Sequence, residues 1–242
     1  MSLKLAYISL LVVSVLSFCF MGSGCGLISS DIASVSFDLP SKSYSFDTNN
    51  GMWKLPMGMF PAIPCGDGQL IMDCCNPPDP LPKPNCAATP LTCEGAPSVC
   101  TLRFPVSVVQ SMDLKKEVPA LATFSNQSII KVTISQIRYT FDSTMNVDLP
   151  EVELFLAPDG VTAADDPSAQ KFGTVPVTPA MMSGQAQVVL EMTAATIFAE
   201  RSQHLGTPFN FIATTTVVVP SGTTIPSGGV NLTVTGRAKA SL

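Results

Sequence analysis

Cysteine is the residue type whose number and spacing in this chain offer the most chemistry. The eight cysteines are Cys19, Cys25, Cys65, Cys74, Cys75, Cys86, Cys93 and Cys100. The last six all lie within residues 65–100. A zinc or iron–sulfur site is normally built from paired C-x-x-C spacings, and this segment contains none. We therefore predict that the six form disulfides and that the chain binds no metal.

The composition of the same segment favours disulfides. Its seven prolines exclude a long helix or a central strand. It has few large apolar side chains with which to build a core, and disulfides formed in an oxidising compartment are the usual remedy. Six cysteines permit many connectivities, and the sequence does not choose among them. Asp67, Gly68 and Asp73 raise the alternative of a calcium loop, but the alternating acidic pattern of such loops is missing, and a turn explains Asp67-Gly68.

The remaining residue types that carry catalysis are sparse. The one histidine, His204, falls in the last turn of a predicted helix, where Glu200 and the helix dipole explain it. Glu151 and Glu153 lie two apart, hence on one solvated strand face, whereas a glycosidase pair comes from separate elements. No G-x-S-x-G, H-E-x-x-H or phosphate-binding glycine loop occurs. We predict no catalytic residue, no cofactor and no enzymatic activity.

The N-terminus has the pattern of an export signal. Lys4 precedes an uncharged stretch, Leu5–Met21, and small residues occupy positions 22–24 before Cys25. A positive start, an apolar stretch and a small-residue cleavage site are typical of a secretory signal peptide, here residues 1–24. The alternative is an uncleaved membrane anchor. This stretch falls just short of a usual span and contains three serines.

The residues Met21-Gly22-Ser23-Gly24-Cys25 resemble the lipobox of bacterial lipoproteins. The resemblance implies cleavage before Cys25 and diacylglycerol, with acyl chains such as palmitate, on its thiol. Residues 25–32 would then be a lipidated tether. Gly22 stands where the family prefers Leu. Gly26 replaces the Asp that would retain the protein in the inner membrane, so the analogy places it in the outer membrane.

Cysteine parity favours the same interpretation. Cys19 is removed with the signal peptide. If Cys25 carries lipid, the six cysteines of residues 65–100 can pair completely. If Cys25 were an ordinary residue, an exported chain would keep one odd thiol, which is unusual.

Composition favours an exported β protein. Hydrophobic residues make up 46% of the chain and charged residues only 13%, against about a quarter in typical soluble proteins. The net charge is −5, and Lys and Arg form no cluster. An acidic surface of this kind repels phosphate backbones, so nucleic acid is excluded as a partner.

Alternation of apolar and polar residues predicts strands over most of residues 33–242. The expected strands cover residues 33–46 (interrupted at Pro40), 102–108, 130–141, 152–156, 186–192, 209–219 and 230–240. The apolar phase changes at Ser135-Gln136, which predicts a β-bulge. A single helix is expected over 193–205, across an open end of the sandwich.

These elements predict an all-β domain, an immunoglobulin-like antiparallel sandwich of two sheets with one short helix. The Cys/Pro-rich segment, about residues 48–100, is expected to be an insertion in this single domain. Val175-Pro176-Val177, leading into a strand after Ser183-Gly184, is faintly similar to late-embryogenesis-abundant-type sandwiches. That resemblance implies the fold and nothing about function.

One apolar cluster offers a candidate partner surface beside the insertion. It comprises Met52, Trp53, Met57, Met59 and Phe60. We expect these side chains to pack between the insertion and the sandwich, and an exposed surface for a protein partner or a membrane is the functional alternative.

We expect a non-catalytic binding or scaffolding lipoprotein, held in the envelope membrane by its lipid and engaging an envelope protein. Two alternatives remain open at this point. One is a soluble secreted binding module, which differs only at Cys25, and the other is an envelope enzyme or accessory whose site is built from loops.

Overall fold

A computed structural model describes residues 34–48, 59–60, 62, 65, 91–94, 98–122, 131–202 and 206–241. Residues 35–241 form one of the two units into which the chain divides, and the fold is that of this unit. It is mostly strand, arranged as two antiparallel sheets. The predicted two-sheet β-sandwich is confirmed. No described helix is long and apolar enough to cross a membrane.

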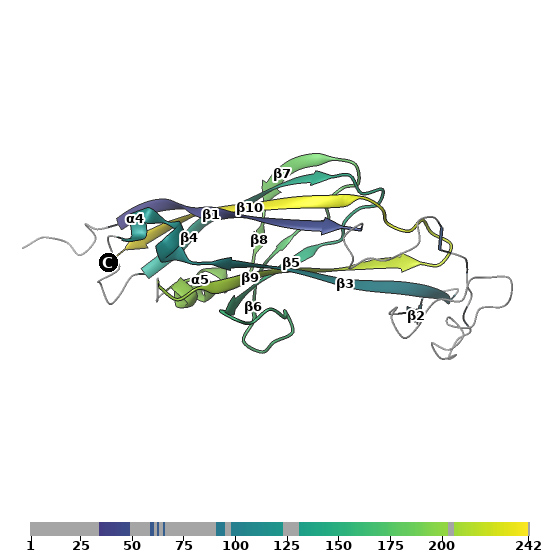
Figure 1. The fold of residues 1–242 in the computed structure, drawn as a ribbon, viewed down its shortest axis with the longest axis horizontal. Helices are drawn as coiled ribbons and strands as arrows, with labels where there is room; N and C mark the ends of the chain where they lie inside the picture. Colours follow the sequence, from purple (N-terminus) through teal and green to yellow (C-terminus); the bar gives the residue numbers. More distant parts are fainter. Residues whose placement is uncertain are drawn as a thin grey trace, which may run out of the picture. The chain divides into compact units, whose positions relative to one another are not determined.

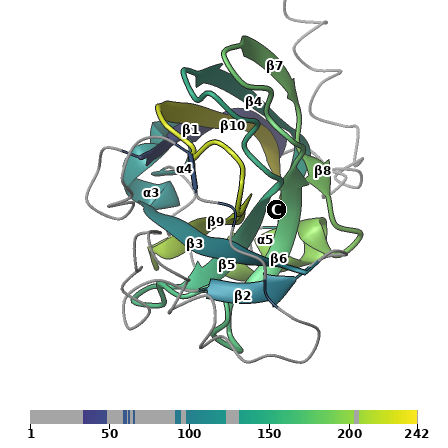
Figure 2. The same ribbon diagram turned by 90° about the vertical axis from the view of Figure 1, so that its right-hand side faces the viewer.

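The two sheets have four and six strands and lie one above the other (Figures 1 and 2). The four-stranded sheet has the order β1 (Ser34–Asp47), β10 (Gly229–Ser241), β4 (Lys131–Ser143) and β7 (Ser183–Gln187). The six-stranded sheet has the order β2 (Leu91–Glu94), β3 (Val99–Met112), β9 (Phe209–Pro220), β5 (Val152–Pro158), β6 (Gln170–Val175) and β8 (Val189–Leu190).

The core lies between the sheets and is formed by the alternating residues that the sequence pattern identified. β10 buries Val230, Leu232 and Val234, while the intervening residues face outward. β9 is central and is buried on both faces from Phe209 to Ala213. Such alternation is what a strand with one face in a core requires.

The predicted bulge in β4 is confirmed at the expected residues. Gln136 is paired with Arg237 and Ile134 with Ala238, so Ser135 is the extra residue. The Ser135 hydroxyl donates to the Arg237 carbonyl oxygen at 2.9 Å. The bulge keeps the residues on both sides of it facing the same core, because one extra residue reverses the alternation.

The predicted helix is present as α5 (Ala194–Ser202) and contacts β4 of one sheet and β5 and β6 of the other. Its Phe198 packs edge-on against Phe209, with ring centroids 6.0 Å apart, and also meets Phe172. As predicted, the helix covers core that the sheets leave open. Two four-residue helices, α3 (Leu114–Glu117) and α4 (Pro119–Ala122), were not predicted. They are too short to show an apolar period.

One predicted strand was wrong in its extent. Residues 186–192 were expected to form a single strand with one buried face, but the chain changes sheets within it. β7 ends at Gln187 in the four-stranded sheet, and β8 begins at Val189 in the six-stranded sheet. Val188 is buried, whereas Leu190 and Met192 are exposed. Because the chain passes from one sheet to the other here, Val188, the crossing residue, is buried, while the apolar residues after it are not.

Candidate functional site

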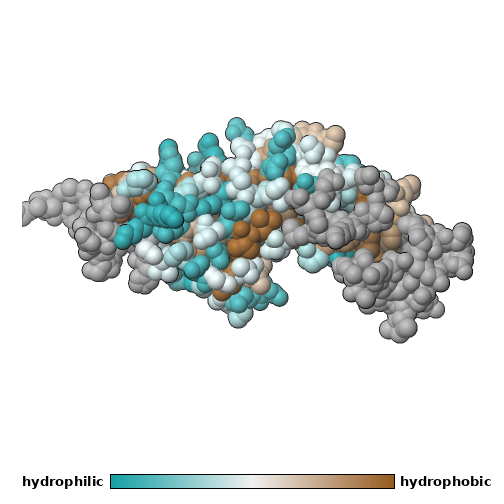
Figure 3. All heavy atoms as spheres, viewed as in Figure 1, coloured by the Kyte–Doolittle hydropathy of each residue, from teal (hydrophilic) through white to brown (hydrophobic). Residues whose placement is uncertain are grey.

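The exposed apolar side chains gather in one segment. Of the eight large hydrophobic residues that are exposed in the described part of the chain, six lie between residues 177 and 192. They are Val177, Met181, Met182, Val189, Leu190 and Met192. Figure 3 shows a different face, on which β1 and β3 lie and hydrophobic residues surface among hydrophilic ones. We call these six residues together with β7 the open-edge surface.

Two sharp changes of direction place this surface. Before β7, Met181 adopts a φ of 53°, in the left-handed region that non-glycine residues rarely enter. The turn is held by the Met181 N–H, which donates to the Met145 carbonyl oxygen at 3.1 Å, and by the Ala180 N–H, which donates to Asp148 Oδ1 at 2.8 Å. After β7, Val188 crosses between the sheets. The apolar residues at both ends of β7 therefore stay at the surface.

β7 is the edge of its sheet, and all five of its residues are exposed. The Met182 carbonyl oxygen accepts from Ser143 N at 2.9 Å, and Val188 N donates to the Ile137 carbonyl oxygen at 3.2 Å, both in the β7–β4 register. Backbone groups alternate between the two sides of an antiparallel strand, so the even-numbered residues bond to β4. The odd-numbered residues direct their N–H and C=O groups to the open side. These are Ser183, Gln185 and Gln187.

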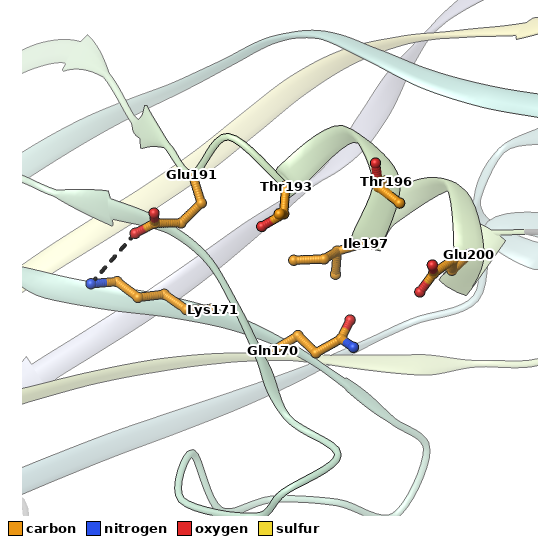
Figure 4. Close-up of a pocket in the computed structure, with 7 residues that line it drawn as sticks. All are labelled: Gln170, Lys171, Glu191, Thr193, Thr196, Ile197 and Glu200. Carbon is orange, nitrogen blue, oxygen red and sulfur yellow. Dashed lines mark ion pairs between the residues drawn. The ribbon is translucent and has the colours of Figure 1, made fainter.

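A pocket of about 550 Å³ adjoins this surface, between β6 and α5 (Figure 4). It is lined by Gln170, Lys171, Glu191, Thr193, Thr196, Ile197 and Glu200. Lys171 and Glu191 point toward one another at one end, and Glu200 lies at the other. Gln170 Oε1 is buried without a hydrogen-bond donor among the described residues, so an N–H or O–H group in the pocket would satisfy it.

The ion pairs of Lys171 determine the charge that the pocket presents. Lys171 Nζ lies 2.7 Å from Glu153 Oε1 and 3.5 Å from Glu191 Oε1. The hydrogen bond to Glu153 raises the pKa of Lys171, so the amine stays protonated and is neither a nucleophile nor a base at neutral pH. With Glu200, the lining favours a cationic or hydroxyl-bearing group.

A second pocket, of about 520 Å³, lies against β1, β4 and β10 at the bulge. It is lined by Asp38, Leu39, Ser41, Gln136, Arg138, Thr235, Gly236 and Arg237. Arg237 Nε lies 3.1 Å from Asp38 Oδ1, and both side chains are mostly exposed. The two residues neutralise each other in solvent, which leaves Arg138 as the remaining charge of the pocket.

The predicted cysteine pairing is confirmed in part. Cys65 and Cys93 form a disulfide, and Cys100 is disulfide-bonded as well. The disulfide attaches β2 to a point 28 residues earlier in the chain. The other predicted disulfide cysteines, Cys74, Cys75 and Cys86, lie outside the described residues, as does the predicted lipidation site Cys25.

Two residues of the predicted partner cluster fall within the described part of the chain. Met59 is 68% exposed, while Phe60 is buried at 6% and its N–H donates to the Thr223 carbonyl oxygen. Phe60 is therefore part of the core rather than of a surface. Met52, Trp53 and Met57 lie outside the described residues, and so does His204.

Sequence reasoning missed the open-edge surface, although one signal was present. Residues 172–190 contain no charged side chain. Glu153 lies on the solvated face as expected, with its side chain 47% exposed, and it forms an ion pair there with Lys171. Among the described residues, no three His, Cys, Asp or Glu side chains gather as they would around a metal ion.

Comparison with known proteins gives no family. No family model matches the chain, and no curated protein matches it. Among solved structures, the decameric BFDV capsid protein has a TM-score of 0.32 and 10% identity over 86% of this chain and 99% of its own. Turnip yellow mosaic virus has a TM-score of 0.23 and 10% identity over 58% of this chain and 80% of its own. At such low TM-scores these likenesses carry no functional meaning.

Proposed function

We propose that this chain is an exported, non-catalytic binding protein, anchored to the envelope membrane through lipid on Cys25. It engages an envelope protein partner through the open-edge surface. The observation that carries the proposal is the gathering of six exposed hydrophobic side chains between residues 177 and 192. Exposed apolar patches on otherwise polar surfaces are typical of protein interfaces.

Two further features support this function. The disulfide between Cys65 and Cys93 is typical of an oxidising compartment, which agrees with a cleaved signal peptide. The pocket beside Lys171 and Glu191 adjoins the apolar residues and has room for one polar side chain of a partner. An apolar patch next to a polar pocket combines affinity with orientation.

The anchor is tested by Cys25→Ser. The peptidase that cleaves before a lipobox cysteine requires the modified thiol, so this variant should accumulate at precursor size and incorporate no radiolabelled palmitate. Normal processing and release into the soluble fraction would favour a soluble secreted module instead.

The binding surface is tested by the double variant Met181→Ser/Met182→Ser. Cross-linking in envelope membranes should lose any adduct made through this surface, while the melting temperature stays within a few degrees. The matched control is Val218→Ser, which removes an exposed hydrophobic side chain of β9 far along the sequence from the surface. Equal adducts in all three proteins would remove the basis of the proposal.

A further inference from the structure

The open backbone groups of β7 identify the kind of partner that fits them. Ser183, Gln185 and Gln187 each direct one N–H and one C=O away from β4, and these groups have no partner among the described residues. Such a row is a template for one more strand. The bound partner is therefore an extended segment that forms main-chain hydrogen bonds.

The absence of charged residues in β7 and in the sequence beside it bears on which partner can pair with it. In a pairing between two copies about a twofold axis, each residue near the axis meets the same surface on its partner, so a charged residue would meet its own like. Residues 172–190 contain no charge, although the chain as a whole carries −5. β7 also lacks the lysine or proline with which edge strands usually prevent pairing.

The order of residues along the segment is also self-complementary. Antiparallel pairing centred on Gln185 brings Ser183 of one copy opposite Gln187 of the other. All three odd-numbered residues then meet odd-numbered residues, so every outward N–H finds a C=O. The register ends there, because after Gln187 each chain passes at Val188 into the other sheet.

We propose that the partner of the open-edge surface is a second copy of this chain, paired through β7 to form a continuous eight-stranded sheet. This inference rests on the proposed function, because a five-residue strand is a small interface and benefits from the high local concentration of two chains anchored in one membrane.

Disulfide trapping in the full chain, expressed and processed in envelope membranes, tests the proposal. Gln185→Cys places a thiol directly opposite its copy, at a Cα separation of about 5.5 Å, which a disulfide spans. The control Thr140→Cys is equally exposed and lies on β4, opposite Gln185. In the dimer its two copies are three strand spacings apart, about 14 Å, which is beyond the reach of a disulfide.

Non-reducing gels should show at least tenfold more cross-linked dimer for Gln185→Cys than for Thr140→Cys. A second experiment needs no thiol and measures dimerisation by sedimentation in detergent. Gln185→Lys should raise the dissociation constant of the dimer at least tenfold, because two like charges meet at the axis. Thr140→Lys should leave it unchanged. Equal behaviour of the two positions in both arms would overturn the proposal. If Gln185→Cys instead cross-links to a different envelope protein, the dimer is wrong and the proposed binding function stands.

Discussion

The two edge strands of the four-stranded sheet, β1 and β7, differ in the hydrogen bonds that connect them to elements outside the sheet. β1 is a long edge strand, and the rest of the molecule covers it: Lys42 Nζ donates to the Ser111 carbonyl oxygen and to Glu117 Oε2, both at 2.7 Å. Gln110 Nε2 donates to the Ser43 carbonyl oxygen at 3.0 Å. β7 is short and has no comparable bonds from its open side among the described residues.

This difference shows which edge is available for binding. Edge strands expose unpaired backbone groups, and proteins normally interrupt them with charge, proline or a covering element. β1 has Pro40 and Lys42 and is joined to β3 and α3, whereas β7 has none of these. In the six-stranded sheet, β8 has only two residues, and β2 is held by the Cys65–Cys93 disulfide. β7 is thus the edge with the fewest barriers to a new strand.

The largest expected effect comes from releasing the covalently held edge. The double variant Cys65→Ala/Cys93→Ala removes the disulfide without leaving an odd thiol. A loop closed over 28 residues corresponds to about 3–4 kcal/mol of unfolding free energy. We expect urea unfolding to show a loss of that size, and a melting temperature lower by roughly 10 °C.

Reduced wild-type protein is the control for this variant, and it should be destabilised at least as much. A loss of less than about 1 kcal/mol for the double variant would show that β2 is held by its ladder to β3 and that the disulfide adds little.

Two prolines test whether the two sides of β7 differ as described. The Ala186 N–H faces β4, so Ala186→Pro removes a ladder bond and should cost about 2 kcal/mol or more of unfolding free energy. The Gln185 N–H faces outward, so Gln185→Pro should change stability by less than about 1 kcal/mol. Urea unfolding of the two variants measures the difference. Equal losses would mean that the alternation assigned to β7 is wrong.

The covering of β1 is tested at Lys42, whose side chain is only 12% exposed. Lys42→Met keeps the apolar part of the side chain but leaves the Ser111 carbonyl oxygen and Glu117 without this donor. We expect a loss of about 1–2 kcal/mol, below the value for a buried pair because Glu117 is partly exposed. Lys239→Met on β10 is the exposed control and should be neutral. Similar stability of both variants would show that β1 needs no such cover.

The sequence predicted the sandwich and most of its strands because alternation is a local property that survives in the structure, but it missed the short strands β2 and β6. The phase change at Ser135 even located the bulge, since one extra residue must restore the inward face. The crossing at Val188 could not be predicted, because sheet membership depends on partners distant in sequence. Apolar residues at 190 and 192 looked like a buried face and are exposed.

The candidate surface was less predictable for the same reason. A methionine or leucine in an alternating pattern is normally assigned to the core, and only the neighbouring strands decide otherwise. Phe60 shows the opposite case: it was one residue of the candidate partner cluster, and the structure buries it, as the packing interpretation of that cluster expects. The uncharged stretch 172–190 was visible but is equally typical of a buried strand.

The smallest expected effect concerns the pH dependence of the β2 edge. Glu94 accepts two hydrogen bonds from Arg103, each at 2.7 Å, and one from the Thr92 hydroxyl at 2.6 Å. The hydrogen bonds from Arg103 lower the pKa of Glu94 from 4.5 to about 2. The folded state thus favours the ionised carboxylate, and the stabilisation is complete above the unfolded pKa of 4.5. It declines as the pH falls from 4.5 and is lost below about 2.

Carboxyl NMR titration should therefore find Glu94 still ionised at pH 3.5, and Glu94→Gln should reduce the acid dependence of stability between pH 4.5 and 2. Asp166, whose pKa is lowered by hydrogen bonds from Ser168, contributes in the same direction and remains in both proteins. Because residues 172–190 are uncharged, pairing through β7 should not respond to this titration. Acid would then weaken the ion pair between Glu94 and Arg103 while the pairing through β7 stays unchanged. A Glu94 titration midpoint near 4.5 would contradict the bidentate contact with Arg103.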